Sequence, residues 1–207
     1  ATFSARPKQR AANRGGFFMS QAAAKNTQSS KFSVREICYT GLFAAVIAVM
    51  AQISIPMPLG VPMTMQTFAI TLAAVVLGSK LSAMASLVYL ILGAVGVPVL
   101  ASFSGGIDKF VGPTGGFLIS FPLMAYIIGL GVEHRNAFKG AFPLAVVVGT
   151  VVNYIVGVIL FVIVAHSTLA VAISACVLPF IPTAIIKAVL ACAIGLNIRK
   201  RIPGLKA

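Results

Sequence analysis

The chain has 207 residues, of which 59% are apolar and only 9% are charged. A soluble domain carries about 25% charged residues and has no interior for so many apolar side chains, so the composition excludes an ordinary water-soluble protein. The formal net charge of +13 arises mainly near the two ends of the chain, which disfavours nucleic-acid binding and is typical of a protein surrounded by membrane lipid.

Residues 1–30 are polar and basic and contain no long apolar run. We expect a disordered leader here, part of it foreign to the natural chain, because Met19 is a candidate natural start. Residues 31–207 are then expected to form a single six-helix membrane domain.

Six stretches of nearly 20 mostly apolar residues follow, and a helix of that length can cross a bilayer. They predict transmembrane helices over residues 36–55, 63–79, 81–100, 116–132, 141–165 and 180–198. The expected fold class is therefore all-α and polytopic. A shorter apolar piece, residues 168–178, is too short to span and is expected to lie outside before helix six. The alternative is one long helix broken by Pro179 and Pro182.

Basic residues assign the sides of the membrane. With the N-terminus inside, the inner segments hold fourteen Lys and Arg residues, whereas the outer loops hold Lys109 alone. Cytoplasmic segments carry such an excess of Lys and Arg. We therefore expect both termini in the cytoplasm (N-in/C-in), loops near residues 60, 108 and 170 outside, and a multi-pass location in the cell membrane.

The first helix carries small residues spaced four apart. Gly41 pairs with Ala45, and Ala44 pairs with Ala48. Such pairs let helices approach closely. They indicate either packing within this chain or a docking face for a partner subunit.

The outer loop 101–116 is rich in glycine, whose backbone can approach a ligand closely and donate N–H groups to it. Its candidate ligand-binding residues are Asp108, Gly112, Thr114, Gly115 and Gly116. A simple turn is the alternative interpretation.

Three polar residues lie inside predicted helices. Asn153 and Tyr154 in helix five could contact either a neighbouring helix or a ligand. Lys187 is the only charged residue deep in an apolar run, where a Lys costs about 2.5–3.5 kcal/mol on insertion scales. It either reaches the outer headgroups or receives a substrate carboxylate in an outward-facing cavity.

No catalytic set is visible. The three carboxylates and two histidines are scattered, and the cysteines Cys38, Cys176 and Cys192 form no paired motif. A metal or acid–base enzyme needs convergent ligands. We therefore expect no enzyme activity, no metal and no cofactor.

Three linked runs carry a family resemblance: AQISIPMPLGVPMTMQTFAITLAAVVLG, then SGG followed by GPTGGFLISFPLMAYIIG, then VLPFIPTAIIKAVLA. They resemble BioY, the biotin-specific S component of energy-coupling factor (ECF) transporters. The resemblance covers roughly residues 35–200. It implies six helices, a biotin site beneath the outer loops with biotin as substrate, and a transmembrane coupling subunit with cytoplasmic ATPases as partners. It also implies that the small-residue face of helix one docks on the coupling subunit.

One position departs from the family pattern. BioY proteins often carry an Asp three residues before the helix-six Lys, where this chain has Ala184. The family Asp resembles a partner for the ureido ring, so Asp108, Asn153 or loop backbone would have to substitute. Two other functions stay open: an S component for another small vitamin, and a membrane scaffold that transports nothing.

Overall fold

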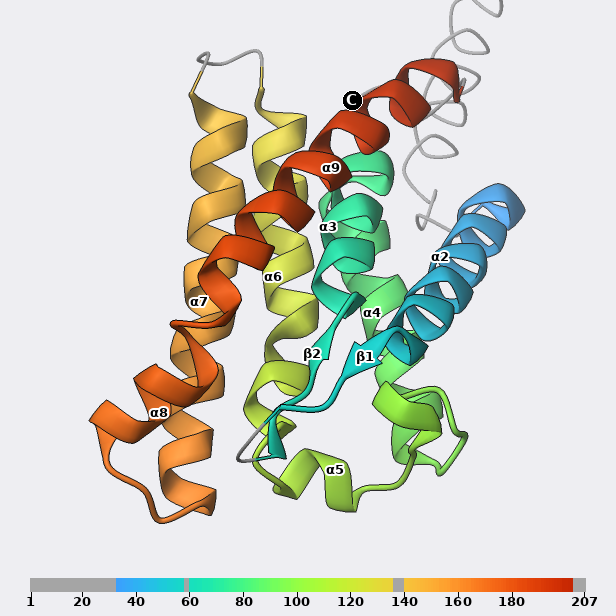
Figure 1. Ribbon diagram of the computed structural model, residues 1–207. Coiled ribbons are helices and arrows are strands. Elements are labelled where there is room, and N and C mark those ends of the chain that lie inside the picture. Colours follow the sequence, from blue (N-terminus) through green and yellow to red (C-terminus); the bar gives the residue numbers. More distant parts are fainter. Residues whose placement is uncertain (1–32, 58–59, 136–139, 203–207) are drawn as a thin grey trace, which may run out of the picture. The chain divides into compact units, whose positions relative to one another are not determined.

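The longer helices between residues 66 and 164 run alongside one another, and the last long helix crosses them at an angle (Figure 1). This computed structural model describes residues 33–57, 60–135 and 140–202, so the expected leader over 1–30 lies outside the described residues. Residues from Arg35 onward form one unit, and the account below concerns that unit.

Helices account for most of the described chain. The helices are α2 (Val34–Gln52), α3 (Gln66–Leu77), α4 (Ser79–Ala94), α5 (Asp108–Val111), α6 (Gly115–Glu133), α7 (Ala141–Val164), α8 (Leu169–Cys176) and α9 (Phe180–Arg201), with a 3₁₀ turn η2 (Ala101–Phe103). Two short strands, β1 (Ser54–Ile55) and β2 (Met63–Thr64), pair antiparallel with Ser54 opposite Thr64. This ribbon lies at the end of the bundle that also holds α5 (Figure 1).

Each of the six predicted spans contains a helix, but the six helices differ in length. Among the described residues, α2, α6, α7 and α9 are long and apolar enough to cross a membrane. The stretches 63–79 and 81–100 instead form α3 and α4, of 12 and 16 residues. At 1.5 Å per residue these two helices extend about 18 and 24 Å, less than the roughly 30 Å hydrocarbon core. The count of six crossings therefore stays a prediction.

Helix α3 is the buried centre of the unit. All of its residues except Thr67 are buried, and it packs against α4, α6 and α9. A helix that is apolar on every side is stable only when it is surrounded, which explains why α3 has no lipid-facing surface. Protein, rather than lipid, therefore covers this helix.

Glycines allow α6 and α7 to pack closely. A Cβ on Gly116 would lie 2.6 Å from the carbonyl oxygen of Val156, and one on Gly131 would lie 2.1 Å from the Cβ of Ala145. Both distances are too short for real contacts, so larger residues would push the helices apart.

At the end of the bundle away from the β-ribbon, side chains satisfy the ends of α3 and α4. Glu133 accepts hydrogen bonds from the Ser79 backbone N–H at 2.7 Å and from the Ser79 hydroxyl at 2.9 Å. Arg199 donates to the carbonyl oxygens of Val75 and Val76, each at 3.2 Å. The first N–H and last C=O groups of a helix lack partners within it, so both contacts close helix termini.

Helix α8 is separate from α9. Residues 169–176 form their own short helix, and a turn over residues 177–179 separates it from Phe180, where α9 begins. A separate short segment before the last helix is confirmed, its position outside the membrane stays a prediction, and the single proline-broken helix is wrong. Figure 1 shows α8 turned away from the direction of α9.

The small-residue face of α2 divides into two. Ala44 is only 4% exposed and belongs to the main core, and Ala48 packs against that core, whereas Gly41 and Ala45 are exposed. Residues three apart on a helix lie on sides that differ by about 60° at 3.6 residues per turn, so the four residues do not share one exposed side. Partner docking by this face stays a prediction.

Candidate ligand-binding cavity

A cavity of about 270 Å³ lies beneath the β-ribbon, the η2 turn and α5. Helices α3, α6, α7, α8 and α9 supply its walls. Its lining comprises Gly60, Val61, Pro62, Thr64, Gln66, Thr67, Leu100, Ala101, Ser102, Ser104, Lys109, Thr114, Phe117, Leu118, Phe121, Asn153, Tyr154, Cys176, Phe180, Thr183, Ala184 and Lys187. Most of these are apolar or carry a single polar atom, as is common in pockets for small molecules.

Lys187 projects into this cavity from the first half of α9. Its ammonium donates one hydrogen bond, 2.7 Å long, to the backbone carbonyl of Thr64 in β2. An ammonium has three hydrogens, so two remain available. Among the described residues, no carboxylate lies within ion-pair distance of Lys187. The cavity therefore contains a half-buried cation without a counter-charge.

Asn153 is 2% exposed and faces the cavity from α7. Its amide nitrogen donates to the carbonyl oxygen of Phe117 at 3.1 Å and to the hydroxyl of Ser120 at 2.7 Å. Both amide hydrogens are thereby used, and the orientation of the side chain is set. Its Oδ1 atom is left as an acceptor, with no hydrogen-bond partner among the described residues.

Aromatic rings form part of the apolar wall. Phe117 meets Tyr154 edge to face, with ring centroids 6.3 Å apart and planes at 83°. Gly157 makes room for the Phe117 ring, because a Cβ there would lie 2.3 Å from it. Phe121 and Phe180 complete this side of the cavity. Such a wall can cover the apolar body of a ligand.

A series of hydrogen bonds holds the part of the cavity lining that α3 supplies. Gln66 is buried, donates to the Tyr89 hydroxyl, and accepts a hydrogen bond of 2.8 Å from the Thr64 hydroxyl. The same Thr64 supplies the carbonyl that binds Lys187. These hydrogen bonds therefore connect the Lys187 ammonium to the buried helix α3.

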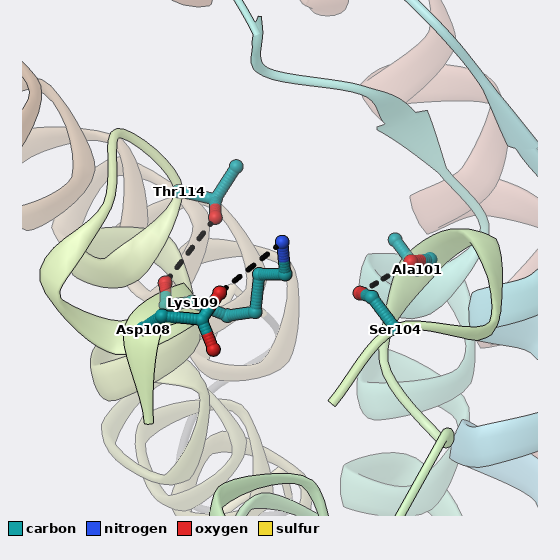
Figure 2. A network of polar contacts seen from close by, with 5 residues as sticks. All are labelled: Ala101, Ser104, Asp108, Lys109 and Thr114. Atoms are coloured by element: carbon teal, nitrogen blue, oxygen red, sulfur yellow. Dashed lines mark hydrogen bonds and ion pairs between the residues drawn. The ribbon is translucent and has the colours of Figure 1, made fainter. Parts of the chain in front are cut away.

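Lys109 and Thr114 reach the cavity from the glycine-rich loop. Lys109 forms an ion pair of 3.3 Å with Asp108, and the Thr114 hydroxyl donates to the Lys109 carbonyl at 3.4 Å. Figure 2 shows the Lys109 side chain extending toward the turn in which Ser104 donates to the carbonyl of Ala101. A second cation thus stands at the mouth, but it already has a carboxylate partner.

Four predicted residues do not line the cavity. Asp108 has a side chain that is 68% exposed, and Gly112 stands outside the lining. Gly115 and Gly116 are buried in packing contacts, since a Cβ on Gly115 would lie 1.9 Å from the Phe110 carbonyl oxygen. Thr114, Asn153, Tyr154 and Lys187, by contrast, do come together there. The glycines of this loop are needed chiefly for close approach of the backbone.

Several lining residues were missed by the sequence reasoning. Thr64 and Gln66 are polar residues at the start of a predicted helix, a position that by itself gives no signal of ligand binding. Phe117, Thr183 and Ser102 carried no local signal, because only the crossing of distant segments brings them together.

Burial raises the pKa of the Cys176 thiol to about 11, so this lining residue is uncharged at neutral pH.

These features define a class: a helical membrane protein with a largely apolar cavity that contains one half-buried ammonium. Among the described residues, no three His, Cys, Asp or Glu side chains gather to hold a metal ion. The BioY family model matches residues 22–204. The chain belongs to the BioY family.

Individual relatives agree with this assignment. The biotin transporter BioY of Thermotoga maritima is 42% identical over 168 residues, which cover 81% of this chain and 97% of that protein. The biotin transporter BioY of Rhodobacter capsulatus is 37% identical, covering 75% of this chain and 88% of that protein. A crystal structure of the S-component for biotin from an ECF-type ABC transporter matches with a TM-score of 0.73 at 28% identity, covering 81% of this chain and 92% of that one.

Proposed function

We propose that this chain captures biotin in the cavity and serves as the biotin-specific subunit of an ECF-type transporter. Its membership of the BioY family supports the substrate class. The single structural observation that carries the binding mode is Lys187, a half-buried ammonium facing the cavity without a carboxylate partner among the described residues. A Lys inside an apolar helix needs a partner or a path to water, and the carboxylate of biotin is a natural counter-charge.

The rest of the ligand fits the remaining groups. Biotin has an apolar ring and chain, which suit the wall formed by Phe117, Phe121 and Phe180. Its ureido ring carries N–H donors, and the Oδ1 of Asn153, a cavity-lining residue, accepts no hydrogen bond among the described residues. We infer that Asn153 accepts from the ureido ring, in place of the Asp that the family resemblance leads us to expect where this chain has Ala184.

Direct binding tests this function. Purified protein should bind labelled biotin at one site per chain, and unlabelled biotin should displace the label. Biotin amide should compete much less well, because it cannot form the ion pair with Lys187. Because Ala184 lines the cavity, another vitamin is the rival ligand. If the protein binds thiamine or riboflavin and does not bind biotin, that vitamin rather than biotin is the substrate.

We also propose six membrane crossings, with both termini in the cytoplasm and the cavity facing outward. The charge distribution supports this orientation, because Lys109 alone lies in the proposed outer loops. On this topology α3 and α4 cross together with the loops that precede and follow them. A single cysteine at position 108, in a variant without the three natural cysteines, should react with an impermeant reagent added outside intact cells. Reaction only after permeabilisation would reverse the orientation.

The partner on this proposal is a transmembrane coupling subunit with cytoplasmic ATPases. The exposed small residues Gly41 and Ala45 on α2 offer a place for close helix approach. Ala45→Leu should reduce co-purification of the coupling subunit while biotin binding is retained. Ala193→Leu, an exposed alanine on α9, is the matched control. Equal co-purification by both variants would exclude this face as the docking site.

A further inference from the structure

A second hollow, the α7–α9 groove, lies between α7, α8 and α9 and has a volume of about 650 Å³. Thirteen of its fifteen lining residues have purely hydrocarbon side chains; Thr150 and Tyr154 are the exceptions. The Thr150 hydroxyl is already satisfied, because it donates to the Val146 carbonyl at 2.8 Å. The groove therefore offers almost nothing to a polar ligand.

The groove opens where hydrocarbon is expected. Both α7 and α9 are long and apolar enough to cross a membrane. Lining residues extend along α7 from Val146 to Ile159, which is about 20 Å at 1.5 Å per residue, against a hydrocarbon core of roughly 30 Å. Helix α7 packs on α6, and α9 packs on α3, so side chains do not close the seam between α7 and α9.

The shape of the walls favours a flexible chain over a helix. Transmembrane helices associate closely where small residues line the interface. Here the walls are mostly Val and Ile, and only Ala184 and Ala188 are small. If the groove were empty, its lining atoms would have no neighbours for dispersion contacts, and water would find almost no hydrogen-bond partners on its apolar surface. A hydrocarbon chain can follow such an irregular surface and restore those contacts.

The groove also adjoins the ligand cavity. Tyr154 and Ala184 line both hollows, so these two residues form the partition between them. We propose that the α7–α9 groove binds one acyl chain of a membrane phospholipid, which closes the side wall of the ligand cavity. This inference goes beyond the proposed function and holds whichever small ligand the cavity takes.

Two neighbouring residues on α7 provide a matched test. Val147 lines the groove and Val148 does not, and the two are 59% and 41% exposed. Native mass spectrometry of protein extracted in mild detergent should show one retained phospholipid on the parent. Val147→Trp should reduce the lipid-bound fraction at least fivefold, and Val148→Trp should leave it unchanged. Absence of lipid on the parent, or equal retention by both variants, overturns the proposal.

A second measurement applies even if Val147→Trp does not fold. The chain has no Trp, so single Trp residues can be placed at Ile185, inside the groove, and at Val189, outside it. Each protein is reconstituted in brominated phosphatidylcholine vesicles and then transferred to detergent. Quenching should persist for Ile185→Trp and disappear for Val189→Trp. Equal loss from both overturns the proposal, and impaired coupling-subunit assembly of groove variants would then assign the groove to a partner helix.

Discussion

Helix α9 carries four basic residues, and two of them, Lys187 and Arg199, have contrasting surroundings. Arg199 is 7% exposed and gives hydrogen bonds to two carbonyls at the end of α3. Lys187 gives one hydrogen bond to Thr64 and faces an open cavity. A planar guanidinium suits two fixed acceptors, whereas an ammonium retains donors that can rotate toward a ligand. Arg199 thus stabilises the fold at one end of α9, whereas Lys187 is available to bind a ligand at the other.

The same contrast holds for the amino acids around them. At the Arg199 end, the Glu133 carboxylate accepts hydrogen bonds from Ser79, and Gly78 forms the turn between α3 and α4. At the Lys187 end, the Oδ1 of Asn153 has no partner among the described residues. Mutations at the Arg199 end should therefore lower the stability of the protein, whereas mutations at the Lys187 end should lower its affinity for the ligand.

The largest effect is expected for Lys187→Ala. Removal of one partner of a desolvated ion pair costs about 2–5 kcal/mol, or about 30-fold to several thousand-fold in affinity. Equilibrium binding of labelled biotin should therefore weaken by at least about tenfold, without a matching loss of thermal stability. Biotin amide should lose most of its disadvantage in this variant. Unchanged biotin affinity would show that Lys187 does not contribute to binding and that the proposed difference from Arg199 is wrong.

The next effect is expected at the opposite end, for Glu133→Ala. This variant loses charge-assisted hydrogen bonds to Ser79, each contributing about 1.5–3 kcal/mol to stability. Thermal unfolding in detergent should shift to lower temperature, while biotin affinity of the folded protein stays within about twofold. Lys80→Ala, an exposed neighbour, is the control. A loss of affinity without a loss of stability would contradict the division between the two ends.

A smaller effect is expected for Asn153→Ala. Loss of one hydrogen-bond acceptor for the ligand should cost about 1–2 kcal/mol, or about 5- to 30-fold in affinity. Adding Ala184→Asp should restore part of that loss, because it returns an acceptor to the same cavity wall. Thr150→Ala, one turn away and outside the cavity, is the control. The absence of any change in both variants would mean that the ureido ring is satisfied elsewhere.

The smallest effect is expected for Asp108→Asn. The ion pair with Lys109 is exposed, and such pairs contribute only about 0–1 kcal/mol. Biotin affinity should change by less than about fivefold in a titration at physiological salt. A larger change would show that Lys109, rather than Lys187 alone, governs capture of the carboxylate.

The sequence by itself determined the membrane class, six helical segments and the special position of Lys187. These follow from composition, apolar length and the energetic cost of a charge, which depend on local sequence. It also indicated Thr114, Asn153 and Tyr154, which the structure places around the cavity. Gly115, Gly116 and Ala44 were predicted to bind a ligand or a partner, but the structure shows them buried in packing contacts, so their functional roles stay predictions.

Only the tertiary structure decided which residues meet. Thr64 and Lys187 are 123 positions apart, and no local pattern predicts that the carbonyl of one accepts from the other. Likewise, the two unused hydrogens of Lys187 and the free oxygen of Asn153 become apparent only after every nearby donor and acceptor has been assigned. Binding capacity in an apolar interior depends on which polar atoms the fold leaves without a partner, and that is a property of the whole arrangement.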